Sequence, residues 1–371
     1  MNRKTFVALS IAVALQAAGC GPVEDGEGAG DCQLRLPEPG EEPFEQLSDY
    51  CFFNGEPAKQ HLEPSDGVVP YKVRSKLYSD RSRKFRFIVL PDGEKIDFKK
   101  EKMWSFPEGT TIIKTFYYPN DARKPSEGRR ILETRLMIKR EGDWKPQVYL
   151  WNDDQTRAKR YLIGTNRTIN WTDEEGKERE TSYRVPGKNK CKSCHAVDNG
   201  IALLGPRTRQ MNRSFEYADG EQNQIERLDE LGMLDGEVPD VSELDKLADP
   251  KNEELSLEKR ARAYLEGNCA HCHNPKGGAS NSGMFLGLEE ENKRDLGICK
   301  NPVAAGDGTG GYDFDIKPGF PDESIMIFRM KSSDPEIKMP ELPLRTVDQF
   351  GVDLISKWIA GMSPKGCSAD E

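Results

Sequence analysis

The chain has 371 residues, and its 54 basic and 63 acidic side chains give a formal net charge of −9 at pH 7. This length exceeds the usual size of one domain, so two domains with a leader and a linker are expected. The acidic balance argues against nucleic acid as a partner, because phosphate backbones are bound by concentrated positive charge.

The first residues have the pattern of a segment that is removed on export. Two basic residues precede an apolar run over residues 6–18, which is short for a membrane span, and small residues before Cys20 form a cleavage site. This pattern predicts a lipoprotein signal peptide over residues 1–19 and lipid attachment at Cys20, with ordinary cleavage nearby as the alternative. Residues 20–45 begin with a run rich in Gly, Glu and Asp and are expected to be a flexible tether. We therefore expect an exported, lipid-anchored protein on the periplasmic face of a membrane or on an outer membrane.

Residues 46–196 are predicted to form a β-rich domain. Short apolar and aromatic runs alternate there with turn clusters such as Pro91-Asp92-Gly93. The expected strands cover residues 85–90, 110–118, 131–139, 147–151 and 161–163.

Two Cys-x-x-Cys-His motifs, at residues 191–195 and 269–273, carry the chemistry. The two-residue gap matches the spacing of the two vinyl groups on one haem edge, and the next residue then falls beneath the iron. The motifs therefore predict two covalently bound haem c groups. The attaching thiols are those of Cys191, Cys194, Cys269 and Cys272, and the axial iron ligands are His195 and His273.

Zinc is the competing interpretation, because two Cys-x-x-Cys pairs can form a tetrahedral sulfur site. The motifs begin 78 residues apart, which is far beyond the spacing of a zinc ribbon. Each pair is also followed directly by histidine in a chain with an export leader. These three features favour haem.

The chain beyond the first motif is predicted to be helical. Residues 197–251 are expected to be a helical connector with a helix over 222–234. An amphipathic helix over 257–267 enters the second motif, and a last helix over 347–360 follows a Met-Pro pair, with Thr346 and Gln349 as a capping box. This order matches the small cytochrome c fold. The predicted fold class is α+β, with the β-rich domain followed by an all-α cytochrome c-like (class I) domain over residues 252–371.

Met339 is the predicted second axial ligand of the iron at the second motif. It is followed by proline and lies before the last helix, where the thioether of a cytochrome c approaches the iron and raises its reduction potential. Met284, Met326 and Met330 lack these two features. The sixth ligand of the iron at the first motif is not assigned. The candidate side chains are Met103, Met137, Met211, Met233 and His61, and an empty coordination position is the alternative.

Four cysteines remain outside the motifs and the cleavage site. In an oxidising compartment an even number of cysteines suggests disulfides. Pairing by domain favours Cys32 with Cys51 and Cys299 with Cys367, while other pairings and free buried thiols stay open.

The chain from Phe52 onward resembles a family of exported di-haem c-type cytochromes, in which a β-rich segment precedes the first haem. The resemblance is carried by Gly67-Val68-Val69-Pro70-Tyr71, by residues 104–110, by Glu133-Thr134-Arg135 and by Met339-Pro340. It implies electron transfer with redox partner proteins and supplies no substrate.

A weaker likeness concerns residues 106–114, which are similar to β-sheet cytochromes c-prime and their hydroxylamine-oxidising relatives. It implies a five-coordinate first haem and makes Lys114 a candidate for a link to the macrocycle, with a solvent-facing strand lysine as the alternative. The principal expectation is an electron carrier. The alternatives are a di-haem oxidoreductase whose open first haem acts on peroxide or a small nitrogen oxide, and a sensor or docking subunit.

Overall fold

The computed structural model describes residues 32–38, 40–54, 62–197, 200–342, 344–364 and 367. The predicted signal peptide, Cys20, part of the predicted tether and His61 lie outside the described residues. Contacts divide the chain into Met1–Cys32 and Gln33–Glu371, and the second unit contains every element named below. Among the described residues, no helix has the length and apolar character needed to cross a membrane.

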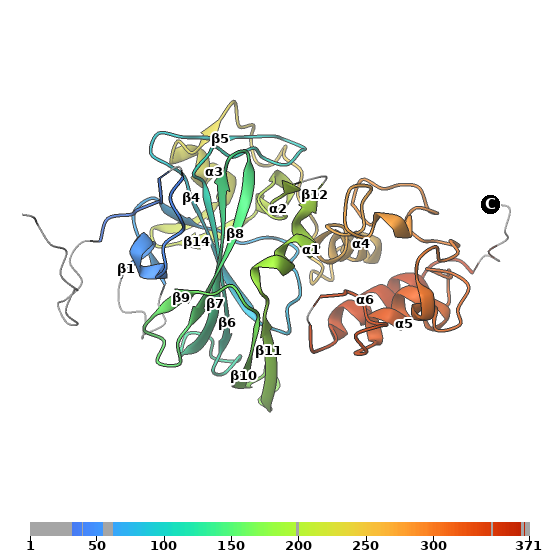
Figure 1. Cartoon of the computed structure of the whole chain (residues 1–371). Helices are drawn as coiled ribbons and strands as arrows, with labels where there is room; N and C mark the ends of the chain where they lie inside the picture. The colour runs from blue at the N-terminus through green and yellow to red at the C-terminus, as the bar shows by residue number, and fades with distance from the viewer. Residues whose placement is uncertain are drawn as a thin grey trace, which may run out of the picture. The chain divides into compact units, whose positions relative to one another are not determined.

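Six antiparallel strands form the main sheet, in the order β3-β4-β6-β7-β8-β9 (Figure 1). Their apolar residues recur with the period of two that places them on the two faces of a sheet. The strands are β3 (Val68–Pro70), β4 (Arg83–Val89), β6 (Thr111–Pro119), β7 (Arg129–Arg140), β8 (Asp143–Trp151) and β9 (Ala158–Arg160).

Four of the five predicted strands are confirmed, as β4, β6, β7 and β8. The strand expected over 161–163 is wrong, because β9 ends at Arg160. Leu162 and Ile163 follow it and are 58% and 75% exposed, so this apolar pair does not face a core.

The two faces of the main sheet are covered differently. One face packs Phe87, Ile113 and Leu136 against the segment that includes η1 (Leu47–Tyr50). The other face has an apolar region at one end that packs against α2 (Thr208–Met211) and α3 (Gln224–Glu230). The opposite end of this second face packs against a hairpin. Charged side chains lie between the end covered by α2 and α3 and the end covered by the hairpin.

That hairpin, β10 (Thr165–Thr172) and β11 (Glu178–Val185), was not expected from the sequence. Most of its residues are charged or polar, so its apolar positions form no continuous run. Only alternate residues, including Ile169, Trp171 and Tyr183, are buried against the sheet. The hairpin leads directly into the first Cys-x-x-Cys-His motif.

Short elements complete the first two thirds of the unit. The helix expected over 222–234 is shorter, because Asn223 caps α3 by accepting a hydrogen bond from the Ile225 N–H and Gly232 adopts a positive φ of 68° after it. Residues 200–251, expected as a helical connector, also contain the hairpin β14–β15. The remaining elements are β1 (Phe53–Asn54), β2 (Glu63–Pro64), β5 (Ile96–Asp97), η3 (Lys188–Cys191), α1 (Lys192–His195), β12 (Ala196–Val197), β13 (Gly200–Ile201), β14 (Ser214–Tyr217), β15 (Gly220–Asn223) and β16 (Leu234–Asp235).

The predicted fold class is wrong, because residues 252–371 form no all-α cytochrome c-like domain. The described part of this region contains only three α-helices, α4 (Leu257–Asn268), α5 (Ile325–Lys331) and α6 (Gln349–Ala360). Turns, isolated bridges and short 3-10 helices make up the rest, because glycines such as Gly297 and Gly319 adopt positive φ and interrupt helices. The described chain is instead β-rich, with several small sheets beside the main one. The 3-10 helices are η4 (Ser280–Ser282), η5 (Gly306–Thr309) and η6 (Pro321–Glu323).

Helices α4, α5 and α6 share one apolar cluster, which includes Leu265, Ile327 and Trp358. The helices expected over 257–267 and 347–360 are therefore confirmed as α4 and α6, with ends shifted by one or two residues. Their caps differ from the expectation: Ser256 caps α4, whereas α6 begins after Asp348 without a side-chain cap. The capping box of Thr346 and Gln349 is wrong, because Thr346 donates to Asp80 and Gln349 donates to Asp353.

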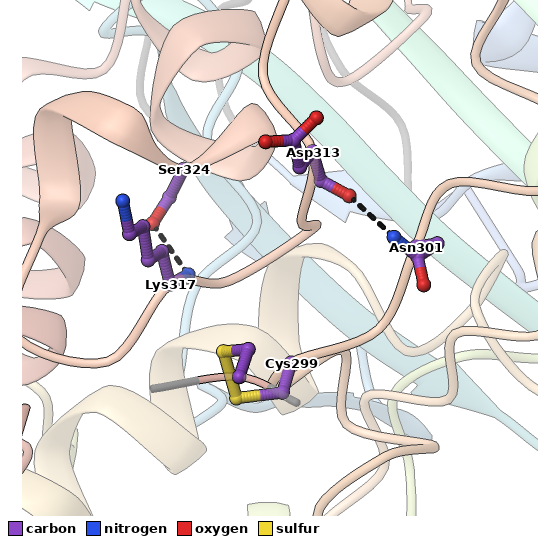
Figure 2. The surroundings of a disulfide bond; sticks show 6 residues. Cys299, Asn301, Asp313, Lys317 and Ser324 are labelled. Atoms are coloured by element: carbon purple, nitrogen blue, oxygen red, sulfur yellow. Dashed lines mark hydrogen bonds between the residues drawn. A yellow bond between two sulfur atoms is a disulfide. The ribbon is translucent and has the colours of Figure 1, made fainter. Parts of the chain in front are cut away.

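A disulfide joins Cys299 and Cys367, as expected, with their Cα atoms 5.1 Å apart. Figure 2 shows this bond beside a loop where the Asn301 side chain donates to the Asp313 carbonyl. Cys32 and Cys51 are also in the disulfide form.

Replacing Cys299 and Cys367 by serine is expected to lower the free energy of unfolding by about 2–4 kcal/mol. The bond spans a sequence separation of 68 residues and so restricts the unfolded chain. Urea unfolding of the oxidised protein and of the oxidised double variant measures the difference. Equal midpoints for oxidised wild type and variant would contradict the expectation.

Candidate functional site

The first motif lies on η3 and α1, directly after hairpin strand β11. Cys191 and Cys194 are free thiols and are half-buried. The Nδ1 atom of His195 lies 2.7 Å from the Ala202 carbonyl oxygen, so Nδ1 carries the proton and the lone pair is on Nε2. Desolvation lowers the pKa of His195 to about 4, and its imidazole is therefore neutral at pH 7.

The second motif begins where α4 ends, and its arrangement repeats that of the first. Cys269 and Cys272 are free, half-buried thiols. The Nδ1 atom of His273 lies 3.3 Å from the Met284 carbonyl oxygen, which again leaves the lone pair on Nε2. Burial lowers the pKa of His273 and raises the pKa of Cys269 to about 12.

Each motif opens into its own cavity. The first cavity has a volume of about 530 Å³ and is lined by Cys191, Cys194 and His195. The second has a volume of about 580 Å³ and is lined by the cysteines and His273 of the second motif. Both volumes fall within the usual range for sites that enclose an organic ligand.

The two motifs touch one another although 78 residues separate them in sequence. The Cys272 thiol donates to the Ser193 carbonyl at 3.5 Å, and the Cys194 thiol is hydrogen-bonded to that of Cys272. His271, expected only as a spacer residue, is hydrogen-bonded to Cys194. The two cavities therefore adjoin, and they share lining residues that include Leu77, Tyr78, Ser193 and His271.

A loop before β4 holds the two motif regions together. The Tyr78 N–H donates to the Asn268 side chain at 2.8 Å, at the end of α4. The Asp80 carboxylate accepts from the backbone N–H groups of Arg345 and Thr346, each at 2.8 Å. Sequence reasoning missed these positioning roles, because they depend on contacts between residues far apart in the chain.

Met339 lines the second cavity together with His273. Met284, Met326 and Met330 line it as well, so the assignment of Met339 to the iron stays a prediction.

The candidates for the sixth ligand at the first motif lie in different surroundings. Met137, Met211 and Met233 all pack in the apolar core around α2 and α3, and of these three only Met137 also lines the first cavity. Met103 is 37% exposed and does not line this cavity. Of the sixth-ligand candidates in the described ranges, only Met137 lines the first cavity.

Charged side chains form the sheet wall of the first cavity. Arg86 on β4, Lys114 on β6 and Arg135 on β7 are direct partners across neighbouring strands and line this cavity; we call them the cation row. Lys114 thus faces the cavity and not bulk solvent. Desolvation, followed by the charges of Arg86 and Arg135, lowers the pKa of Lys114 to about 7.

Within the described ranges, no group of three or more His, Cys, Asp or Glu side chains is arranged to hold a bare metal ion. Comparisons with protein family models, curated proteins and solved structures find no match to this chain. The resemblance to di-haem cytochromes therefore remains an expectation that rests on the motif residues.

Proposed function

We propose that this protein is a di-haem c-type electron-transfer protein, with one haem attached at each Cys-x-x-Cys-His motif. The observation that carries the proposal is the contact between the two motifs, each of which opens into its own cavity. The proposal does not depend on a cytochrome c fold.

The residues present fit two haem c groups. Each cavity offers two free thiols for thioether bonds and one neutral imidazole whose Nε2 is available as a ligand. A haem iron takes its equatorial ligands from the porphyrin and only axial ligands from the chain, so no cluster of several metal-ligating side chains is needed.

A bound haem c supplies an iron that gains and loses one electron. The chain's own part is to orient the two imidazoles through the Ala202 and Met284 carbonyls, which also increases their basicity as ligands. The contact of Cys194 with Cys272 brings the two attachment points next to each other. Short separation between the two groups favours transfer between them over exchange with solvent species.

The proposal includes the cellular location of the protein and the charge of its partners. The leader and Cys20 support export and lipid anchoring, on the periplasmic face of a membrane or on an outer membrane. The net charge of −9 favours redox partner proteins that present positive charge, because complementary potentials steer encounters.

Intact mass of the full chain, produced in cells with haem attachment machinery, tests the proposal. The mature protein should carry the mass of two haems, and Cys191→Ala/Cys194→Ala and Cys269→Ala/Cys272→Ala should each remove one. A matched Ser193→Ala variant changes a spacer residue and should keep both. A chain that carries no haem in such cells, or haems that cannot be reduced and reoxidised, contradicts the proposal.

An oxidoreductase with an open first haem is the second candidate. It is favoured by the first cavity, where Met137 is the only one of the candidate methionines that lines the wall. Rapid binding of carbon monoxide by the reduced protein, lost in Cys191→Ala/Cys194→Ala, supports this candidate. Low-spin spectra for both irons in both oxidation states support the pure carrier.

A further inference from the structure

We propose that the cation row of Arg86, Lys114 and Arg135 is a binding site for a planar oxyanion, of the carboxylate type, in the first cavity. The carboxylate has two possible sources: a propionate group of the first haem, or a small free anion that enters the cavity. The first source rests on the proposed function, and the second does not.

The strand register places these three cations side by side on one face of the sheet. Arg86 pairs directly with Lys114, and Lys114 pairs directly with Arg135. Directly opposed residues on antiparallel strands have Cβ atoms about 5 Å apart, and like charges in such pairs destabilise a sheet. Three cations in one such row therefore need a compensating negative charge.

The three strands that carry the row supply only one carboxylate, Glu133. Arg86 is only 7% exposed, and among the described residues neither a side-chain hydrogen bond nor a carboxylate compensates the burial of its guanidinium. The Lys114 ammonium lies 5.1 Å from the centroid of the Phe116 ring, and Glu133 is the one carboxylate that interacts favourably with its charge. Arg135 is the one member that is paired, through two hydrogen bonds to Glu133 at 2.6 and 2.9 Å.

The next row of the sheet adds a further cation. Lys84, two residues before Arg86 on β4, lies 5.7 Å from the same Phe116 ring and donates to the Leu77 carbonyl. Desolvation and the neighbouring cations hold the pKa of Lys84 well below its usual value. Glu133 is thus the single carboxylate among four Arg and Lys side chains on this part of the described sheet face.

The geometry selects the class of ligand. A guanidinium presents parallel N–H donors that match the two oxygens of a carboxylate, and an ammonium adds a point charge. The cavity of about 530 Å³ admits a small anion or one edge of a larger group, but its buried wall leaves no room for a macromolecule.

Calorimetric titration with formate, at pH 6 and low ionic strength, tests the site in the full haem-loaded chain, because Lys114 is then protonated and formate is still an anion. If a free anion is the ligand, wild type binds formate, and Arg86→Gln and Lys114→Gln bind it at least 10-fold more weakly. Arg86→Lys should show an intermediate loss, because it keeps the charge but not the paired donors. The control Lys159→Gln, on exposed edge strand β9 of the same sheet, should bind as wild type does.

The second arm uses Cys191→Ala/Cys194→Ala, which retains only the second attachment motif. If a haem propionate occupies the row, loaded wild type does not bind formate, this variant does, and adding Arg86→Gln to it abolishes binding. Intact mass of each sample reports haem attachment independently, so failure of the proposed function is seen separately. Absence of formate binding in both the loaded and the variant chain, or unchanged binding after Arg86→Gln and Lys114→Gln, overturns the proposal.

Discussion

The Glu133→Gln variant is expected to unfold with a free energy about 3–5 kcal/mol below that of wild type, because it removes one partner of a buried ion pair. Glu133 is fully buried and accepts two hydrogen bonds from Arg135 and one from the Tyr183 hydroxyl at 2.7 Å. Without its charge, Arg135 and the other cations of the row face one another without compensation. The neutral amide has nearly the same volume, so loss of packing contributes little.

Urea unfolding followed by circular dichroism measures this effect. The matched control is Asp153→Asn, which removes a carboxylate that pairs with Arg130 and Arg167 but is 75% exposed. Exposed ion pairs contribute about 0–1 kcal/mol, so the control should unfold almost as wild type does. If Glu133→Gln and the control changed stability equally, Glu133 would not be the compensating charge that we infer.

Under the proposed di-haem function, Met339→Ala is expected to lower the midpoint potential of the second haem by on the order of 100 mV, a part of the roughly 0.8 V range that axial ligands set. Methionine as an axial ligand raises the potential of a c-type haem, and alanine cannot ligate. Met339 lies in the loop between α5 and α6 and lines the cavity that His273 also lines. The potential of the first haem should stay unchanged.

Potentiometric titration with absorption spectroscopy resolves the two haems and checks this expectation. Met330→Ala and Met284→Ala are matched controls, because both methionines line the same cavity. Each should leave the potential of the second haem close to that of wild type. A large fall in Met330→Ala or Met284→Ala, with none in Met339→Ala, would move the ligand assignment to that residue.

Local pattern accounts for the parts of the fold that were predicted correctly. Strands β4, β6, β7 and β8 follow from apolar periodicity, and helices α4 and α6 from apolar stripes at helical spacing. The prediction of the fold class was wrong because it inferred an all-α domain from two helices, which are themselves present. The glycines and prolines between those helices determine turns and 3-10 helices, and helix order alone does not reveal this.

The sequence by itself determined where a cysteine pair and its histidine lie within five consecutive residues, and from this alone it predicted haem attachment at both motifs. Only the tertiary structure decided that Cys194 and Cys272 touch, that Tyr78 and Asp80 hold the motif regions together, and that Arg86, Lys114 and Arg135 form one row. The physical reason is that such contacts join residues far apart in the chain. They are set by strand register and by the packing of distant segments, and these quantities have no signature in local spacing.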